Sequence, residues 1–164
     1  MATALNWLDE VIVLNESRDE SVPGDVSVYR SVDEGCRAIE NWWVENSEGF
    51  AFTATGVRLV LGVNAAGEVI VSRREECAEG PAIVLSWLQA LAQNTLEARR
   101  RAAKKGKTIL SRAEQVDALP KSVEGLLAYI GFPWLATRDW FAPGCLLLSA
   151  LIAVVLVLVL AQLV

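Results

Sequence analysis

Residues 50–72 read FAFTATGVRLVLGVNAAGEVIVS, and this stretch decides the fold of the chain. Apolar residues alternate along FAFT and VRLVLGV, which is the period of a β-strand, and ATG and NAAG are typical turn sequences. The pattern predicts a three-stranded antiparallel meander. The alternation in DVSVY, residues 25–29, predicts another strand that would join the meander as a fourth.

A long helix should cover one face of this meander. Pro81 suits a first helical turn, and apolar residues recur at helical spacing from there to about Lys104. The apolar stripe is Ile83, Val84, Trp87, Leu88, Leu91 and Leu96. The predicted class is α+β, a small antiparallel meander sheet covered by a long helix, followed by short helices and one C-terminal transmembrane helix.

The short helices are predicted from capping patterns. Ser31 and Glu34 have the spacing of a capping box, in which each side chain accepts a hydrogen bond from the other residue's amide, and predict a helix over 32–40. The same spacing at Ser111 predicts a short helix that ends before Pro120. Ser122 should cap a further helix that Gly131 ends.

The N-terminal region is predicted from spacing and composition. Residues 3–14 place apolar side chains at helical spacing, which indicates a short helix or a helix that runs into a strand. Residues 15–25 are polar and contain Pro-Gly, which is typical of a flexible linker. Residues 41–49 are predicted to be extended.

The last twenty residues, 145–164, read CLLLSALIAVVLVLVLAQLV and contain no charge, Pro or Gly. As a helix they would span about 30 Å, the thickness of a bilayer hydrocarbon core. A buried core helix is the alternative, but such helices rarely run this long without a polar face. The prediction is a single transmembrane anchor over 143–164.

The location of this segment predicts a tail-anchored, single-pass membrane protein. The N-terminus lacks the basic region of a signal peptide, so the N-terminal domain should be cytosolic and the C-terminus on the far side. The aromatic residues expected at the membrane interface are Trp134, Trp140 and Phe141. Ser149 and Ala153 form a small-xxx-small pair that would allow a weak homodimer. Cys145 is either a palmitoylation site or a small residue of the span.

Four regions follow from these patterns. Residues 1–24 are an N-terminal helical segment with a linker, and residues 25–110 are the α+β domain. Residues 111–142 contain the short helices and the aromatic juxtamembrane segment, and residues 143–164 are the anchor.

Composition argues against several function classes. The 164 residues carry a formal net charge of −5 and include no His, which removes the usual general base and the commonest metal ligand. The three Cys form no CxxC pair, so a zinc site is not expected. No catalytic residue, metal or cofactor is predicted, and an enzyme is the least favoured class.

A basic cluster stands out in this acidic chain. Its members are Arg99, Arg100, Arg101, Lys104, Lys105 and Lys107. The cluster is interpreted either as a solvated helix end that complements the helix dipole, or as a contact with lipid headgroups, nucleic acid or an acidic protein. Because aromatic residues that would stack on bases are lacking nearby, nucleic acid is disfavoured.

The acidic residues Glu45 and Glu48, together with Trp43, are the candidate contacts for a protein partner. In a strand, Trp42 and Trp43 would point to opposite faces, so that one joins the core and the other could anchor a partner. Nothing in the sequence fixes two carboxylates at a separation useful for catalysis. Surface charge is the alternative interpretation of Glu45 and Glu48.

Residues 25–72 contain VSVYRSVDE, AIEN and VENSEGFAFTATG in that order. This order resembles the N-terminal half of small bacterial α/β proteins of the toxin-immunity type. The resemblance covers about a third of the chain and implies binding of a protein rather than catalysis, with Glu45 and Glu48 in the contact.

The expected function is protein binding at a membrane by the cytosolic domain, in an immunity-like role. The alternative is a membrane-tethered regulatory or scaffold protein.

Overall fold

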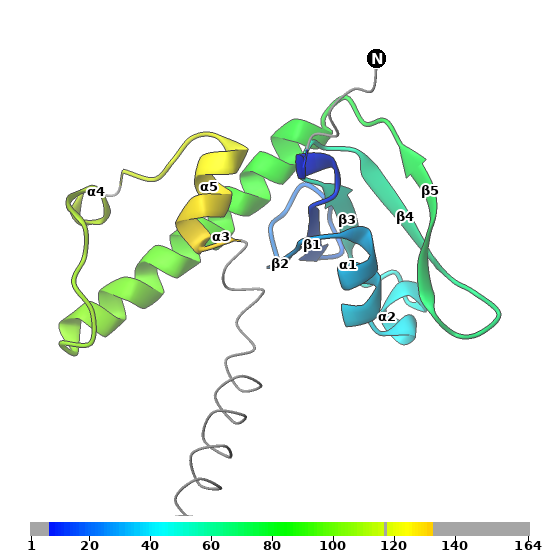
Figure 1. Ribbon diagram of the computed structural model, residues 1–164, viewed down its shortest axis with the longest axis horizontal. Helices are drawn as coiled ribbons and strands as arrows, with labels where there is room; N and C mark the ends of the chain where they lie inside the picture. Colours follow the sequence, from blue (N-terminus) through cyan, green and yellow to red (C-terminus); the bar gives the residue numbers. More distant parts are fainter. Residues whose placement is uncertain (1–6, 117, 133–164) are drawn as a thin grey trace, which may run out of the picture. The chain divides into compact units, whose positions relative to one another are not determined.

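A computed structural model of the chain describes residues 7–116 and 118–132 (Figure 1). The strands in this part of the chain are β1 (Ile12–Glu16), β2 (Asp25–Tyr29), β3 (Phe50–Thr53), β4 (Arg58–Val63) and β5 (Val69–Glu75). The helices are the 3-10 helix η1 (Trp7–Asp9) and the α-helices α1 (Val32–Ala38), α2 (Asn41–Glu45), α3 (Gly80–Lys104), α4 (Arg112–Gln115) and α5 (Val123–Ile130).

The strands form one antiparallel sheet in the order β2-β1-β3-β4-β5. The predicted meander is confirmed as β3, β4 and β5, and residues 25–29 form a strand of the same sheet. The sheet has one strand more than predicted, since β1 lies between β2 and β3. The α+β class and the long helix are also confirmed.

The helix predicted over 3–14 is wrong for most of its described part. Residues 7–9 form only a 3-10 turn, and residues 12–16 are the interior strand β1, between β2 and β3. The alternative, a helix that runs into a strand, is nearer to the structure. Val11 and Val13 join the core on one face of the sheet, whereas Ile12 and Leu14 join the core on the other. A strand buried on both faces is a short apolar run, which periodicity alone cannot distinguish from a helix.

The polar segment that follows β1 is a hairpin connection rather than a linker. The buried Asn15 side chain donates to the Val22 carbonyl at 3.0 Å and accepts from the Gly24 amide at 2.7 Å. These two bonds join β1 to the last residues of the loop, directly before β2. Residues 7–29 therefore belong to the same folded unit as the rest of the sheet.

The extended chain predicted over 41–49 is also wrong at its start, because residues 41–45 form α2. The turn of helix directs Trp43 into the core below the sheet, where it packs with Leu14, Ala51 and Leu59. Burial of this large ring, rather than local propensity, selects the helical conformation.

The capping predictions differ in outcome. Ser111 and Glu114 form a complete capping box at the start of α4, and Ser122 caps α5, which Gly131 ends. At α1, Ser31 accepts the Glu34 amide as predicted, but the Glu34 carboxylate binds the Arg30 amide at 2.7 Å and the Arg30 guanidinium. The reciprocal half of that capping box is therefore absent.

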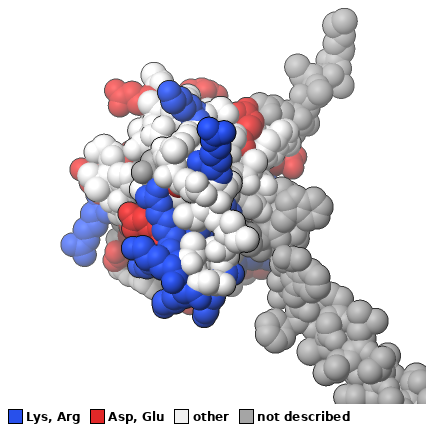
Figure 2. Space-filling model, turned by 90° about the vertical axis from the view of Figure 1, so that its left-hand side faces the viewer, with Lys and Arg blue, Asp and Glu red and all other residues white. Residues whose placement is uncertain are grey.

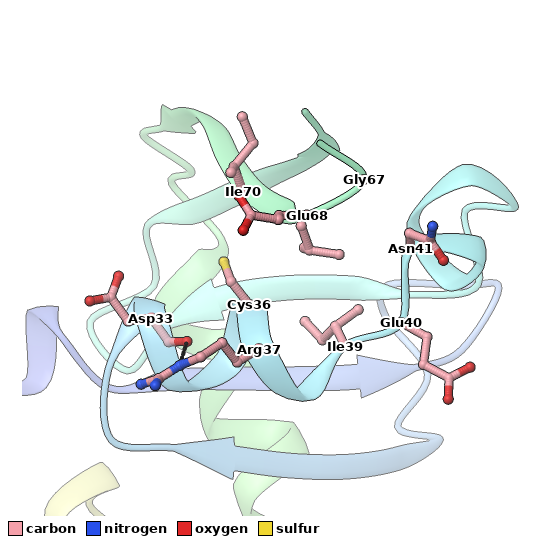
Figure 3. Close-up of a pocket in the computed structure, with 10 residues that line it drawn as sticks. Asp33, Cys36, Arg37, Ile39, Glu40, Asn41, Gly67, Glu68 and Ile70 are labelled. Atoms are coloured by element: carbon pink, nitrogen blue, oxygen red, sulfur yellow. Dashed lines mark hydrogen bonds between the residues drawn. The ribbon is translucent and has the colours of Figure 1, made fainter. Parts of the chain in front are cut away.

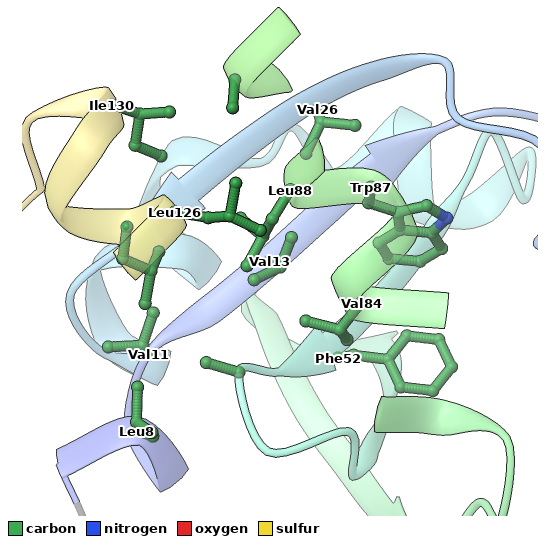
Figure 4. Close-up of a cluster of buried hydrophobic side chains, with 13 residues drawn as sticks. Leu8, Val11, Val13, Val26, Phe52, Val84, Trp87, Leu88, Leu126 and Ile130 are labelled. Carbon is green, nitrogen blue, oxygen red and sulfur yellow. The ribbon is translucent and has the colours of Figure 1, made fainter. Parts of the chain in front are cut away.

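The two faces of the sheet carry separate hydrophobic cores. On one face α3 and α5 pack over β1, β2 and β3 (Figure 4). There the rings of Phe52 and Trp87 pack edge to face, with 5.3 Å between the ring centres. On the other face α1 and α2 pack over the sheet around Ile12 and Leu14. Among the described residues, no helix combines the length and apolar character that a membrane span requires.

The start of α3 lies directly on the β3–β4 turn. Gly56 has a φ of +93°, and its carbonyl oxygen lies so close to Gly80 that a Cβ atom at Gly80 would overlap it. A Cβ at Gly56 would in turn overlap the backbone of Gly80 and Pro81. The turn and the helix therefore pack backbone to backbone, which fixes where α3 begins.

Candidate functional site

An open concave surface of the described domain lies beside α1. This helix contacts β2 and β5, the two edge strands of the sheet. In a flat sheet of five strands these edges would be about 19 Å apart, too far for one helix to reach both. The sheet must therefore curve around α1, and the curvature brings the β4–β5 hairpin beside the helix.

Between α1 and this hairpin is a groove with a volume of about 730 Å³ (Figure 3). The α1 side is provided by the helix and by the segment that leads into α2, and the other side by the turn and first residues of β5. The lining residues are Asp33, Cys36, Arg37, Ile39, Glu40, Asn41, Gly67, Glu68, Val69 and Ile70.

The charge of the groove is negative. Asp33, Glu40 and Glu68 are exposed carboxylates, and Arg37 is the one basic residue among the lining residues. The Arg37 Nε donates to the Asp33 carbonyl at 3.0 Å, which holds the guanidinium against α1. The three carboxylates therefore set the sign of the charge in the groove, which should attract positively charged groups.

Two exposed apolar side chains lie at the groove. Ile70, on β5, is 41% exposed, and Trp42, at the start of α2, is 49% exposed. The Trp42 indole N–H donates to the Glu40 carboxylate, which fixes the ring beside the groove. Trp42 lines a smaller hollow of about 260 Å³ that shares Ile39 and Glu40 with the groove. The two hollows are therefore adjacent parts of one surface.

The thiol of Cys36 points from α1 toward β5 (Figure 3). Burial raises the pKa of this thiol, Asp33 raises it further, and a hydrogen bond from the Val71 amide lowers it only in part. Because the thiolate is the nucleophilic form, a raised pKa lowers the reactivity of Cys36. In the groove the thiol instead accepts a backbone hydrogen bond from the edge strand.

The predicted partner contacts are placed differently from one another. Trp43 is only 7% exposed, so its assignment as a partner contact is corrected, and the exposed ring of the pair is Trp42. In a helix the two rings point about 100° apart rather than to opposite faces of a strand. Glu45 is exposed at the end of α2 and Glu48 is half-buried beyond it, and neither lines the groove.

Comparison with protein-family models, curated proteins and solved structures finds no match. The surfaces of the domain are therefore the guide to its function. Among the described residues, no three His, Cys, Asp or Glu side chains form a group that could hold a metal ion.

The basic cluster is divided into two parts by the fold. The Arg99 guanidinium binds the Glu114 carboxylate at 2.7 Å and the Tyr129 carbonyl at 3.2 Å, and it lies 4.9 Å from the centre of the Tyr129 ring. Arg100 donates to the Glu114 carbonyl at 2.9 Å. Both arginines thus connect α3 to α4 and α5, whereas Arg101 and the three lysines of the cluster are exposed.

Glu114 is the centre of these contacts. Its carboxylate also accepts from the Ser111 amide at 2.8 Å and from the Tyr129 hydroxyl at 3.2 Å. The bond from Arg99, followed by those from Ser111, lowers the pKa of Glu114 to about 2. The ionised Glu114 carboxylate therefore holds α4 and α5 in position against α3. Of these contacts, the sequence spacing predicts only the capping box with Ser111.

The remaining predicted sites lie outside the described residues. These are the interface aromatics Trp134, Trp140 and Phe141, the pair Ser149 and Ala153, and the apolar segment 143–164 with Cys145.

Proposed function

We propose that this chain is a membrane-tethered protein whose folded domain binds a basic, extended segment of a protein partner in the groove beside α1. The observation that carries the proposal is the open groove of about 730 Å³ that adjoins the half-exposed Trp42. The three exposed carboxylates of the groove supply charge complementarity to Lys and Arg side chains.

The shape and chemistry of the groove favour a polypeptide over a small molecule. Small-molecule sites are usually enclosed and lined mainly by apolar side chains, with few polar groups. This groove is open, and charged or amide side chains make up half of its lining. An exposed Trp beside such a surface is a frequent anchor of protein interfaces. Binding, rather than catalysis, is the proposed role.

The membrane part of the proposal is supported by the composition of residues 145–164. The chain from Phe132 to Cys145 can extend over no more than about 45 Å, so a span at 145–164 would keep the domain close to the bilayer. A partner would then be bound at the membrane surface.

Deletion of residues 143–164 should make the protein extractable from membranes by carbonate, which the full chain should resist. The apolar segment would be the only part buried in the hydrocarbon core, and without it only surface contacts are left. Carbonate extraction and flotation of the full chain and the truncated chain measure the difference. A truncated chain that resists carbonate extraction would contradict the proposed anchor.

The partner can be identified by site-specific crosslinking in membranes. A photoreactive amino acid at position 70 lies in the groove, and one at Glu124, an exposed residue of α5, lies over the opposite face of the sheet. We expect a protein that is crosslinked from position 70 and not from position 124. Equal capture from both positions would contradict the groove as the binding site.

The purified partner then allows a quantitative test on the full chain. Trp42→Ala should weaken binding at least tenfold, since an exposed aromatic anchor typically contributes 2 kcal/mol or more, and Glu40→Lys with Glu68→Lys should weaken it about 10–100-fold. The matched control is Glu10→Lys with Glu124→Lys, two exposed carboxylates that do not line the groove. If the control pair weakens binding as much as the groove pair, the effect is one of net charge and the groove is not the site.

The identity of the partner distinguishes the immunity-like role from the regulatory or scaffold role. The resemblance of residues 25–72 to toxin-immunity proteins favours a toxin that the domain neutralises. A resident membrane protein captured from position 70 would instead support the regulatory or scaffold role.

A further inference from the structure

A second surface of the domain is formed where α3 ends. Residues 98–116 contain seven of the 15 basic residues of the chain and a single carboxylate, Glu114. Glu114 is buried and bound to Arg99, so it presents no negative charge to the outside. The remainder of this chain is strongly acidic, because its net charge is −5 even with these basic residues included.

The exposed basic residues in this region share one end of the described domain. We call them, with Ile109 and Val116, the basic tip, whose basic members are Arg101, Lys104, Lys105, Lys107 and Arg112. Figure 2, which views the domain from the side where α3 ends and α4 lies, shows Lys and Arg gathered on this face. Arg99 and Arg100 are excluded from the tip because their guanidinium groups bind within the domain.

The apolar members of the basic tip are unusually exposed. Ile109, in the loop between α3 and α4, is 95% exposed, and Val116, directly after α4, is 69% exposed. They are the two most exposed large hydrophobic side chains of the described domain. A surface that combines several cations with protruding aliphatic side chains is suited to an anionic bilayer, where the cations meet headgroups and the aliphatic groups enter the acyl boundary.

We infer that the basic tip docks on the surface of an anionic lipid bilayer and provides a membrane contact separate from the apolar segment 145–164. Each cation near an anionic leaflet increases binding by about fivefold at physiological ionic strength. Nucleic acid is a weaker match because Ile109 and Val116 offer no ring to stack on a base, and in a phosphate-only contact they would remain in water.

Hydrogen–deuterium exchange of the full chain tests this inference. The chain is reconstituted into nanodiscs of phosphatidylcholine alone, or of phosphatidylcholine with 30% phosphatidylserine, and the exchange of residues 105–116 is followed by mass spectrometry. We expect exchange in this segment to be about tenfold slower in the phosphatidylserine nanodiscs and to return to the phosphatidylcholine rate in high salt. Equal exchange in the two lipids would overturn the inference.

Two sets of substitutions distinguish the contribution of the cations of the basic tip from that of its apolar side chains. Arg101→Gln, Lys104→Gln, Lys105→Gln and Lys107→Gln together should abolish the lipid difference, and Ile109→Ser with Val116→Ser should reduce it. The matched control replaces four other exposed arginines with Gln, namely Arg18, Arg37, Arg73 and Arg74. If the control removes the protection as well, the contact depends on total charge and the basic tip has no special role.

Two further measurements make each outcome decisive. Exchange in the buried part of α3, residues 84–96, shows whether a variant is still folded and should be the same in all samples. A 20-base-pair DNA duplex added to the phosphatidylcholine nanodiscs tests the competing partner. Protection by the duplex, without protection by phosphatidylserine, would assign the basic tip to nucleic acid and overturn the lipid assignment.

Discussion

Trp87→Ala should lower the free energy of unfolding by about 3 to 5 kcal/mol, the largest effect expected of a single substitution in this domain. Trp87 is completely buried, packs edge to face on Phe52, and donates its indole N–H to the Glu20 carbonyl at 3.0 Å. Removal of the ring leaves a cavity at the centre of the core between α3 and the sheet. Urea unfolding of the full chain in mild detergent, followed by circular dichroism, measures the change.

A less drastic variant separates the two contributions of Trp87. Trp87→Phe retains most of the apolar volume and loses the hydrogen bond to Glu20, so it should cost only about 1 kcal/mol. The Glu20 carboxylate pairs with Arg58, whose guanidinium lies 5.9 and 5.7 Å from the ring centres of Phe50 and Phe52. The hydrogen bond from the Trp87 indole to Glu20 and the ion pair between Glu20 and Arg58 together hold the β1–β2 loop against the face of the sheet that α3 covers.

The control for this series is Trp42→Ala. Trp42 is 49% exposed, so loss of its ring should change the unfolding free energy by less than about 1 kcal/mol. An equal loss of stability in Trp42→Ala and Trp87→Ala would show that the core is not organised around Trp87.

Glu114→Gln should lower the free energy of unfolding by about 2 kcal/mol at pH 7. The Glu114 pKa of about 2 lies below its ordinary value of 4.5, and a difference of this size corresponds to at most about 3 kcal/mol. The Arg99 side chain is 41% exposed, so solvent screening reduces the figure. This stabilisation depends on the ionised carboxylate and should be lost as the domain is acidified.

The pH dependence has a definite direction. Because the folded pKa is depressed, the stabilisation is fully present above about pH 5 and is lost progressively as the pH falls from the unfolded value of 4.5 toward 2. The difference between the wild-type chain and Glu114→Gln should therefore shrink over this range and become small near pH 2, where about half of the folded-state carboxylate is protonated. Urea unfolding at intervals from pH 7 to pH 2.5 measures it.

Glu124→Gln is the control for Glu114→Gln, since Glu124 is an exposed carboxylate of the neighbouring helix α5. Its effect on stability at pH 7 should be less than about 0.5 kcal/mol. A difference between wild type and Glu114→Gln that stays constant from pH 7 to pH 2.5 would contradict the role of the ionised carboxylate. Glu114→Gln should also speed hydrogen exchange in residues 111–116, because Glu114 holds α4 against α3.

The elements that sequence patterns predict well are those with local signals. The long apolar stripe of α3, the caps of α4 and α5, and the alternating strands of the meander each depend on residues close together in the chain. Local patterns predict β1 and α2 wrongly, because burial against distant residues decides their conformation. The apolar run around β1 reads as a helix until the sheet provides two faces to bury it.

The same distinction applies to the candidate surfaces. The groove brings Asp33 and Glu40 beside Glu68, and no pattern in the sequence indicates that these segments meet. The basic cluster is visible as a run of letters, but consecutive helical residues point in directions about 100° apart. Arg99 and Arg100 are turned toward α4 and α5 for this reason, while Arg101 is left at the surface.

The backbone contact between the β3–β4 turn and the first turn of α3 gives a way to recognise relatives of this domain. Apolar core positions can exchange Val, Ile and Leu during evolution with little cost, so they retain little trace of common descent. Gly56 and Gly80 have no such freedom, because any side chain at either position overlaps backbone atoms. A glycine at the end of the first meander turn and another 24 residues later, next to a proline, should therefore persist after the rest of the sequence has diverged.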